Sequence, residues 1–248
     1  MANPSLERSV SVITGAGRRI GRTIALSLAD AGHDVAVHYH RSKAEADALV
    51  AEIEAKGARA VAVAGDLAAA DHAARLIPEV AKQLGPVTCL INNASEFAID
   101  TIETMTPGSW ARHLDINLRA PVLLAQALAA QLPAGGSGNV INIIDQRVLR
   151  LTPEFFSYTI SKAGLWTATR TLAQALSPRV RVNAIGPGPI LASIHQSAAD
   201  FAAEQEATLL KRGSTPAEIA AAVQFILAAP ALTGQMIALD GGQHLVWR

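Results

Sequence analysis

Short apolar segments alternate with longer, Ala-rich segments of helical periodicity along almost the whole chain of 248 residues. The apolar segments are continuous rather than alternating, which is typical of strands buried on both faces of a parallel sheet. Right-handed crossovers through the intervening helices then build a doubly wound α/β sheet. The predicted strands are residues 10–14, 35–39, 60–64, 87–91, 140–144, 180–185 and 236–239.

The segments between these strands predict helices, and no repeat, linker or low-complexity break divides them. We therefore expect one Rossmann-like domain over residues 1–248, with a mostly parallel, seven-stranded sheet. Pro121 is expected to kink the longest helix. Residues 191–212 have the polar interruptions of a mobile substrate lid, and equally those of an ordinary surface excursion. The predicted helices are residues 22–31, 42–56, 69–84, 107–131, 155–176 and 218–228.

Charge and apolar content narrow the classes of partner. The chain has 21 basic and 21 acidic residues, so it shows no electrostatic footprint for nucleic acid or an anionic membrane. Its apolar runs are interrupted before membrane-spanning length, and no secretion signal opens the chain. The single Cys89 cannot form an internal disulfide and is expected to be a buried apolar residue. We expect a cytoplasmic protein without a nucleic-acid or membrane partner.

The segment 14–21, TGAGRRIG, lies between the first strand and the helix that follows it. Gly15 permits a tight turn, Gly21 permits close packing of the helix, and the helix N-terminus attracts a pyrophosphate. A simple turn without a ligand is the alternative. The segment therefore predicts one end of a dinucleotide site.

The second strand ends in the segment 38–42, HYHRS, where enzymes that prefer NAD usually place an acid for the ribose 2′-hydroxyl. His40, Arg41 and Ser42 are suited instead to the 2′-phosphate of NADPH. A solvated basic loop is the alternative. We expect no metal at His38 and His40, because no further cluster of ligands follows them.

Tyr158 and Lys162 are four residues apart and therefore lie on one face of the predicted helix 155–176. A nearby ammonium favours tyrosinate, so we expect Lys162 to lower the pKa of Tyr158 and to make it a usable proton donor. The position of this pair, after the fifth strand and before the Gly-Pro-rich residues 186–189, is hard to attribute to chance.

With these motifs, Asn92-Asn93-Ala94 and Asp240-Gly241-Gly242, nearly the whole chain resembles the short-chain dehydrogenases/reductases. Arg19 replaces the middle glycine of the family's first motif, and Ser95 replaces the glycine after Asn-Asn-Ala. By this resemblance, Asn117 supports the catalytic Lys162 through water. The positions that match the family's cofactor contacts are Gly15, Arg18, Arg19, Ile20, Gly21, His40, Arg41, Ser42, Asp66, Leu67, Asn93, Ala94, Ser95, Tyr158, Lys162, Pro187 and Gly188.

Asp145 is the departure that bears on the substrate. In carbonyl-reducing members a serine stands thirteen residues before the tyrosine, and in this chain that position is Asp145. An ionised carboxylate only accepts hydrogen bonds, and it would repel a developing alkoxide. It suits a ring that presents N–H donors, or a ring nitrogen that must gain a proton. A protonated Asp145 that replaces the serine hydroxyl is the alternative.

The chain also resembles the pteridine reductases and the bacterial dihydromonapterin/dihydrofolate reductases. This resemblance rests on the Arg19 motif, the segment 38–42, Asn93-Ala94-Ser95 with Phe97, and Asp145 with Tyr158. In those enzymes the pterin lies between the nicotinamide and an aromatic ring, a role that falls on Phe97, although Phe97 as mere loop packing is the alternative. The resemblance implies substrate contacts at Arg19, Ser95, Phe97, Asp145 and Tyr158.

We therefore predict that the chain uses NADPH to reduce a dihydropterin, with Asp145, Tyr158, Lys162 and Asn117 as the catalytic set. The alternatives are a carbonyl reductase, for example of 3-oxoacyl thioesters, and a catalytically silent dinucleotide sensor.

The resemblance also implies a homotetramer that pairs the predicted helices 107–131 and 155–176. Trp247 or Arg248 would close the site of a neighbouring subunit, or else would form a frayed terminus.

Overall fold

The computed structural model describes residues 8–192 and 196–247. Seven strands form one sheet in the order β3-β2-β1-β4-β5-β6-β7, and every pairing is parallel. The predicted fold class is confirmed, with an entirely parallel sheet in place of the mostly parallel one. The strands are β1 Val10–Ile13, β2 Asp34–Tyr39, β3 Ala60–Ala64, β4 Val87–Asn92, β5 Gly138–Ile143, β6 Val180–Pro187 and β7 Met236–Leu239.

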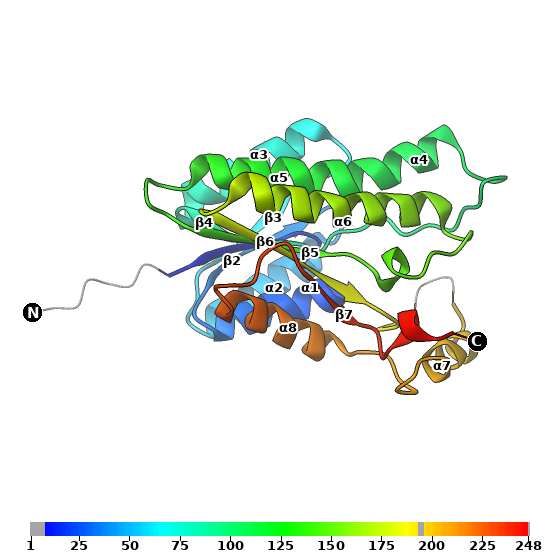
Figure 1. Ribbon diagram of the computed structural model, residues 1–248. Helices are drawn as coiled ribbons and strands as arrows, with labels where there is room; N and C mark the ends of the chain where they lie inside the picture. Colours follow the sequence, from blue (N-terminus) through cyan, green and yellow to red (C-terminus); the bar gives the residue numbers. More distant parts are fainter. Residues whose placement is uncertain (1–7, 193–195, 248) are drawn as a thin grey trace, which may run out of the picture.

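Helices cover both faces of the sheet (Figure 1). On one face lie α1 (Arg19–Asp30), α2 (Lys43–Ala55) and α8 (Pro216–Ala228). On the other face lie α3 (Ala70–Leu84), α5 (Ala120–Gln131) and α6 (Phe156–Leu176). Two apolar clusters fill the layers between sheet and helices, and burying each large aliphatic side chain contributes roughly 1.5–3 kcal/mol.

The predicted helix 107–131 is divided into three parts. It consists of α4 (Pro107–Leu114), a π-helical turn η1 (Asp115–Arg119) and α5. Pro121 has no N–H to donate to the carbonyl of Asn117, so a regular α-helical bond is impossible at this point. The irregularity thus precedes the proline, and the π-helical turn holds Asn117 fully buried.

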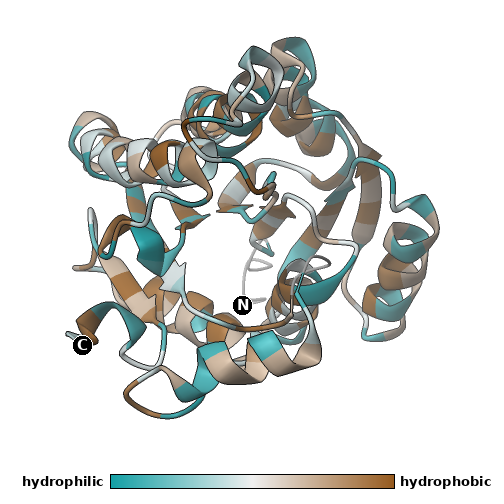
Figure 2. Cartoon of the chain, turned by 90° about the vertical axis from the view of Figure 1, so that its right-hand side faces the viewer, coloured by the Kyte–Doolittle hydropathy of each residue, from teal (hydrophilic) through white to brown (hydrophobic). Residues whose placement is uncertain are grey.

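The strands β1 and β4 are neighbours, and the chain leaves them towards opposite sides of the sheet. In doubly wound sheets, ligands bind in the crevice at the carboxyl ends of the strands, at this point of reversal. Figure 2 looks onto that edge of the sheet. Most strand segments in this view have hydrophobic colours, whereas hydrophilic residues recur along the helices.

A helix that the sequence analysis did not predict, α7 (Ala198–Glu206), lies within the proposed lid 191–212. It begins with a capping box between Ser197 and Asp200. None of its residues is buried, so it lacks the apolar periodicity that marks a helix in the sequence. Residues 193–195 of the lid lie outside the described residues.

No helix among the described residues is long and apolar enough to span a bilayer.

Gly21 lets α1 approach the ends of β1 and β4. A Cβ atom at this position would lie 2.6 Å from both the Asn93 Nδ2 and the Gly15 carbonyl oxygen. Gly21→Ala should lower the free energy of unfolding by roughly 1–3 kcal/mol, the usual cost of overpacking. Denaturant titration followed by circular dichroism measures this change.

Gly108→Ala is the matched control, because a Cβ at Gly108 in α4 would meet only the Thr106 Oγ1, at 3.8 Å. That variant should be neutral or more stable, by up to about 1 kcal/mol. Equal effects of the two substitutions would contradict the close packing at Gly21.

Candidate active site

A hydrogen bond between two side chains lies at the centre of the crevice. The Tyr158 hydroxyl donates to Asp145 Oδ2 at 2.9 Å. Arg147 donates to the same carboxylate twice, from its backbone N–H to Oδ1 at 2.8 Å and from Nη1 to Oδ2 at 3.2 Å. Because three donors converge on Asp145, the carboxylate acts here as an acceptor. Its place is fixed by the short helix η2 (Gln146–Val148), which Asp145 caps.

The expected lowering of the Tyr158 pKa is wrong for this structure. Tyr158 is only 5% exposed, and burial raises the pKa of its hydroxyl well above the usual range. The negative charge of Asp145 and the hydrogen bond to it raise this pKa further. Arg147 and a hydrogen bond with Ser95 act in the opposite direction but do not outweigh these effects. Tyr158 therefore holds its proton at neutral pH.

Lys162 lies one helical turn beyond Tyr158, as its spacing predicts. It is fully buried, its Nζ donates to the Ile143 carbonyl at 2.9 Å, and the Nζ lies 5.6 Å from the centre of the Tyr158 ring. Burial lowers the pKa of Lys162 to about 8, although Asp145 acts in the opposite direction. The ammonium is thus directed to a backbone carbonyl rather than to the tyrosine hydroxyl.

Asn117 braces the loop after β4. Its Oδ1 accepts from the Glu96 N–H at 2.8 Å and from the Ser95 hydroxyl at 3.3 Å. Its Nδ2 donates to the Glu96 carbonyl at 2.9 Å and to the Ser161 hydroxyl at 3.0 Å. The amide therefore ties this loop to α6. Its water-mediated support of Lys162 stays a prediction.

Two phenylalanines and Arg147 form one wall of the site. Phe97 stacks on Phe155 with 4.6 Å between ring centres, and its ring meets Tyr158 at an interplanar angle of 78°. The Arg147 guanidinium lies 5.0 Å from the Phe155 ring centre and 5.8 Å from that of Phe97. Loop packing and pocket lining are therefore both roles of Phe97.

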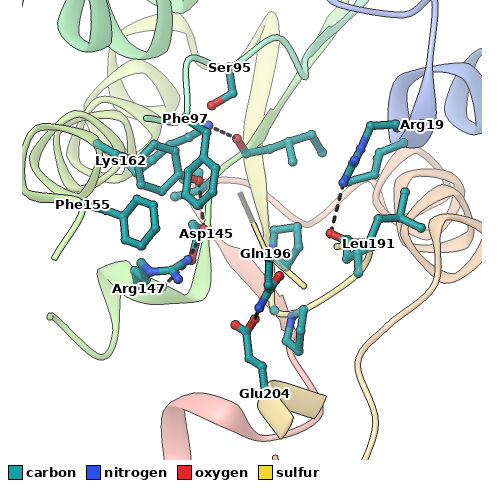
Figure 3. A pocket seen from close by; sticks show the side chains of 18 of the residues that line it. Arg19, Ser95, Phe97, Asp145, Arg147, Phe155, Lys162, Leu191, Gln196 and Glu204 are labelled. Carbon is teal, nitrogen blue, oxygen red and sulfur yellow. Dashed lines mark hydrogen bonds and ion pairs between the residues drawn. The ribbon is translucent and has the colours of Figure 1, made fainter. Parts of the chain in front are cut away.

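These groups open into one pocket of about 630 Å³ (Figure 3). It brings together the predicted substrate contacts with part of the predicted cofactor set. Its walls also include residues from the segments before and within α7. The predicted site residues in its lining are Arg19, Ile20, Asn93, Ser95, Phe97, Asp145, Tyr158, Lys162, Pro187 and Gly188.

The cofactor motif after β1 has the shape that a pyrophosphate needs. Gly15 has a φ of +62°, and α1 begins at Arg19 without a side-chain cap on its first N–H groups. Arg19 keeps the left-handed backbone that the family's glycine allows, with a φ of +53°. Such strain in a residue with a side chain is a mark of functional sites. The Arg19 side chain donates to the carbonyls of Leu191 and Ala192, both at 3.1 Å.

The segment after β2 divides into structural and available residues. His38 is buried between the Gly15 N–H and the Gly65 carbonyl, and burial lowers its pKa to about 4. Arg41 is exposed, without a hydrogen bond or ion pair to another described residue. His40 Nε2 lies 3.9 Å from Asp66 Oδ2. His38 is therefore a neutral structural residue.

Several predicted cofactor residues lie outside the pocket. Ser42 stands at the N-cap position of α2 without a side-chain capping hydrogen bond, and its Oγ lies 2.8 Å from where a Cβ at Gly17 would stand. Arg18 is paired with Glu45, and Leu67 is buried in the apolar core. The other predicted cofactor residues outside the lining are Gly15, Gly21, His40, Arg41, Asp66 and Ala94, and Asn117 of the predicted catalytic set also lies outside it.

The chain end packs against the segment around η2. The Gln243 carbonyl accepts from Arg150 Nη1 at 3.1 Å, and Trp247 is 79% exposed. Arg248 lies outside the described residues, and the contact of the tail with a neighbouring subunit stays a prediction, as does the tetramer.

Sequence reasoning missed Arg147, Phe155, Gln196 and Glu204. Arg147 stands two residues after Asp145, a spacing that a capping interpretation of Asp145 would have singled out. Phe155 precedes α6 with a φ of +55°, which no sequence signal indicated. Glu204 reaches the pocket only because α7 folds against it.

A model of the short-chain dehydrogenase family matches residues 9–203. This chain belongs to that family.

Among solved structures it is similar to the FolM alternative dihydrofolate reductase 1 of Brucella suis in complex with NADP. Identity is 43%, 98% of each chain is covered, and the TM-score is 0.95. The corresponding Brucella canis protein, complexed with NADP, is 42% identical over 98% of this chain and 97% of that one, with a TM-score of 0.92.

The chain is also similar to the 3-oxoacyl-[acyl-carrier-protein] reductase FabG of Staphylococcus epidermidis. Identity is 35% over 240 residues, which cover 95% of this chain and 98% of that protein. A metagenomic blue fluorescent protein in complex with NADPH is 34% identical, with 96% of this chain and 98% of that chain covered and a TM-score of 0.90.

Asp145→Asn should lower the pKa of Tyr158, because it removes the negative charge that keeps the hydroxyl protonated. The shift should be about one pH unit or more. The chain has two tyrosines, so a Tyr39→Phe background leaves Tyr158 as the sole reporter. Ultraviolet titration of tyrosinate gives the midpoint, and circular dichroism checks that the fold persists. An unchanged or raised midpoint would contradict the role given to Asp145.

Proposed function

We propose that this chain is an NADPH-dependent reductase of dihydropterins. The observation that carries the proposal is the acceptor carboxylate of Asp145, hydrogen-bonded to Tyr158 at 2.9 Å where carbonyl reductases of the family place a serine. The similarity to two dihydrofolate reductases of the FolM kind, at 42% and 43% identity, supports it.

The residues present fit NADPH. The open N-terminus of α1 and the positive φ of Gly15 suit a pyrophosphate. The exposed Arg41, beside His40, offers a cation for a 2′-phosphate, and no acid of β2 stands in its place. Three similar structures hold NADP or NADPH.

The chain's own residues divide the work of reduction. NADPH, when bound, supplies the hydride. Tyr158 holds a proton in a buried hydroxyl at the pocket wall, where it donates a hydrogen bond to Asp145; to protonate a ring nitrogen, the hydroxyl would turn from Asp145 to that nitrogen. Asp145 positions the Tyr158 hydroxyl through its hydrogen bond, and its Oδ1, which has a single described donor, keeps acceptor capacity for an N–H group of the heterocycle. Lys162 places a cation behind them, and Asn117 holds the Ser95–Glu96 turn in position.

Reduction of 3-oxoacyl thioesters is the second candidate, and the 35% identity to FabG favours it. It requires a hydrogen-bond donor towards the carbonyl oxygen. Asp145 would have to be protonated, but Arg147 and Tyr158 both direct donors at it. Protonation would remove the negative charge that strengthens these hydrogen bonds, which disfavours this candidate.

Asp145→Ser separates the two candidates. The loss of a charged hydrogen-bond acceptor, worth roughly 1.5–3 kcal/mol, should lower kcat/KM for dihydrobiopterin about tenfold to a hundredfold. Activity on a 3-oxoacyl thioester should stay level or rise, because a serine hydroxyl can donate. Tyr158→Phe should abolish both activities. Dihydropterin reduction that survives Asp145→Ser nearly intact would overturn the proposal.

NADPH should be preferred strongly to NADH, and Arg41→Ala should reduce this preference about tenfold to a hundredfold, since one charge-assisted contact is worth roughly 1.5–3 kcal/mol. The ratio of kcat/KM for the two cofactors measures it. Arg170→Ala, an exposed arginine packed on Trp166, is the control and should leave the ratio unchanged. Equal efficiencies with both cofactors in the unmodified enzyme would refute the assignment.

A further inference from the structure

Glu204 of α7 lines the same pocket as Tyr158 and Phe97, from the wall formed by the segment after β6. The Gln196 Nε2 donates to its Oε2 at 2.9 Å, and the Gln243 Nε2 donates to its Oε1 at 3.2 Å. Figure 3 shows Glu204 and Gln196 across the pocket from Ser95 and Phe97. The carboxylate therefore belongs to the wall that α7 and the segment before it form.

Two segments other than α7 donate hydrogen bonds to the Glu204 carboxylate. Gln196 precedes α7, whereas Gln243 belongs to η3 (Gln243–Leu245) near the chain end. Gln243 is itself fixed, because its carbonyl accepts from Arg150. The position of the carboxylate is therefore set by its own helix α7, by the segment before α7 and by η3.

The charge of Glu204 is not neutralised by its described neighbours. Both of its described partners are neutral amides, and no Lys, Arg or His of the described ranges forms an ion pair with it. Asp145, in contrast, is paired with Arg147. Each Glu204 oxygen keeps acceptor capacity beyond its one amide bond. The pocket therefore presents a negatively charged hydrogen-bond acceptor on the wall formed by α7.

We propose that Glu204 is a specificity-determining residue that favours dihydropterins with a neutral, hydroxylated side chain over those with an anionic one. This inference rests on the proposed function, which places the ring at Tyr158 and directs the side chain across the pocket. Hydroxyl groups donate to a carboxylate in strong, charge-assisted hydrogen bonds. The two carboxylates of the glutamate in dihydrofolate would meet a like charge, which discriminates against that substrate.

Glu204→Gln tests this role, because it removes the charge while it keeps the shape and an acceptor oxygen. We measure kcat and KM for dihydrobiopterin and dihydrofolate at saturating NADPH. The kcat/KM for dihydrobiopterin divided by that for dihydrofolate should fall about tenfold in the variant. The change should lie in the two KM values, with kcat and the KM for NADPH nearly constant.

Glu206→Gln is the matched control on the same helix. Glu206 is exposed, lies outside the pocket lining and faces Lys211 at 3.6 Å. Removal of the Glu206 charge should leave the ratio of the two kcat/KM values unchanged.

Added salt should lower the KM for dihydrofolate in the unmodified enzyme and have a much smaller effect in Glu204→Gln, because ions screen the repulsion between Glu204 and the substrate carboxylates.

The outcomes separate the inference from the proposed function. If both substrates are reduced and Glu204→Gln keeps the ratio of the unmodified enzyme, Glu204 only braces Gln243 and the inference is wrong. An equal fall of the ratio in Glu206→Gln would also overturn it, since a general surface charge would then be responsible. If the unmodified enzyme reduces neither dihydropterin, the proposed function fails and the inference fails with it.

Discussion

Thr14 joins the ends of β1 and β4, and the geometry of the site depends on that junction. Its hydroxyl accepts from the backbone N–H groups of Asn93 and Ala94, both at 3.0 Å. Asn93 in turn donates to the carbonyls of Thr14 and Gly15. Because these two strand ends are fixed, the turn into α1 and the loop towards Phe97 leave the sheet side by side. The cradle for a pyrophosphate and the wall of the substrate pocket thus share one support.

The chemistry turns on which group the tyrosine hydroxyl faces. With a serine in the position of Asp145, two hydroxyls would be available to donate to a substrate oxygen. Here the Asp145 carboxylate accepts a hydrogen bond from the Tyr158 hydroxyl, and the Arg147 side chain donates a second hydrogen bond to the same oxygen. The site therefore offers an acceptor beside a proton donor, which matches a heterocycle that has both N–H groups and a basic nitrogen. A ketone lacks the N–H groups.

The sheet could be predicted because its strands are buried on both faces. Continuous apolar runs marked β3 and β7 to the residue, and Gly57 and Gly85-Pro86 follow the ends of α2 and α3. The helix α7 could not be found in this way, since it buries no residue. The π-helical turn at Asn117 also escaped, because Pro121 indicates an interruption without indicating its form.

The candidate site was predicted where a residue's role follows from spacing along one element. Tyr158 and Lys162 are an example, since both line the pocket from α6. The pKa of Tyr158 was predicted in the wrong direction, because spacing identifies the neighbouring lysine but not the depth of burial or the partner of the hydroxyl. Phe155 and Glu204 depend on contacts between distant segments, which a single sequence does not indicate.

The selectivity of the unmodified enzyme tests the central claim most directly. Initial rates of NADPH oxidation with dihydrobiopterin and with a 3-oxoacyl thioester, at equal low concentrations, give the ratio of the two kcat/KM values. If Asp145 makes this a site for C=N bonds, the dihydropterin should be reduced faster by at least about tenfold, since a mismatched charged hydrogen bond costs roughly 1.5–3 kcal/mol. Faster reduction of the thioester, with little or no turnover of the dihydropterin, would contradict it.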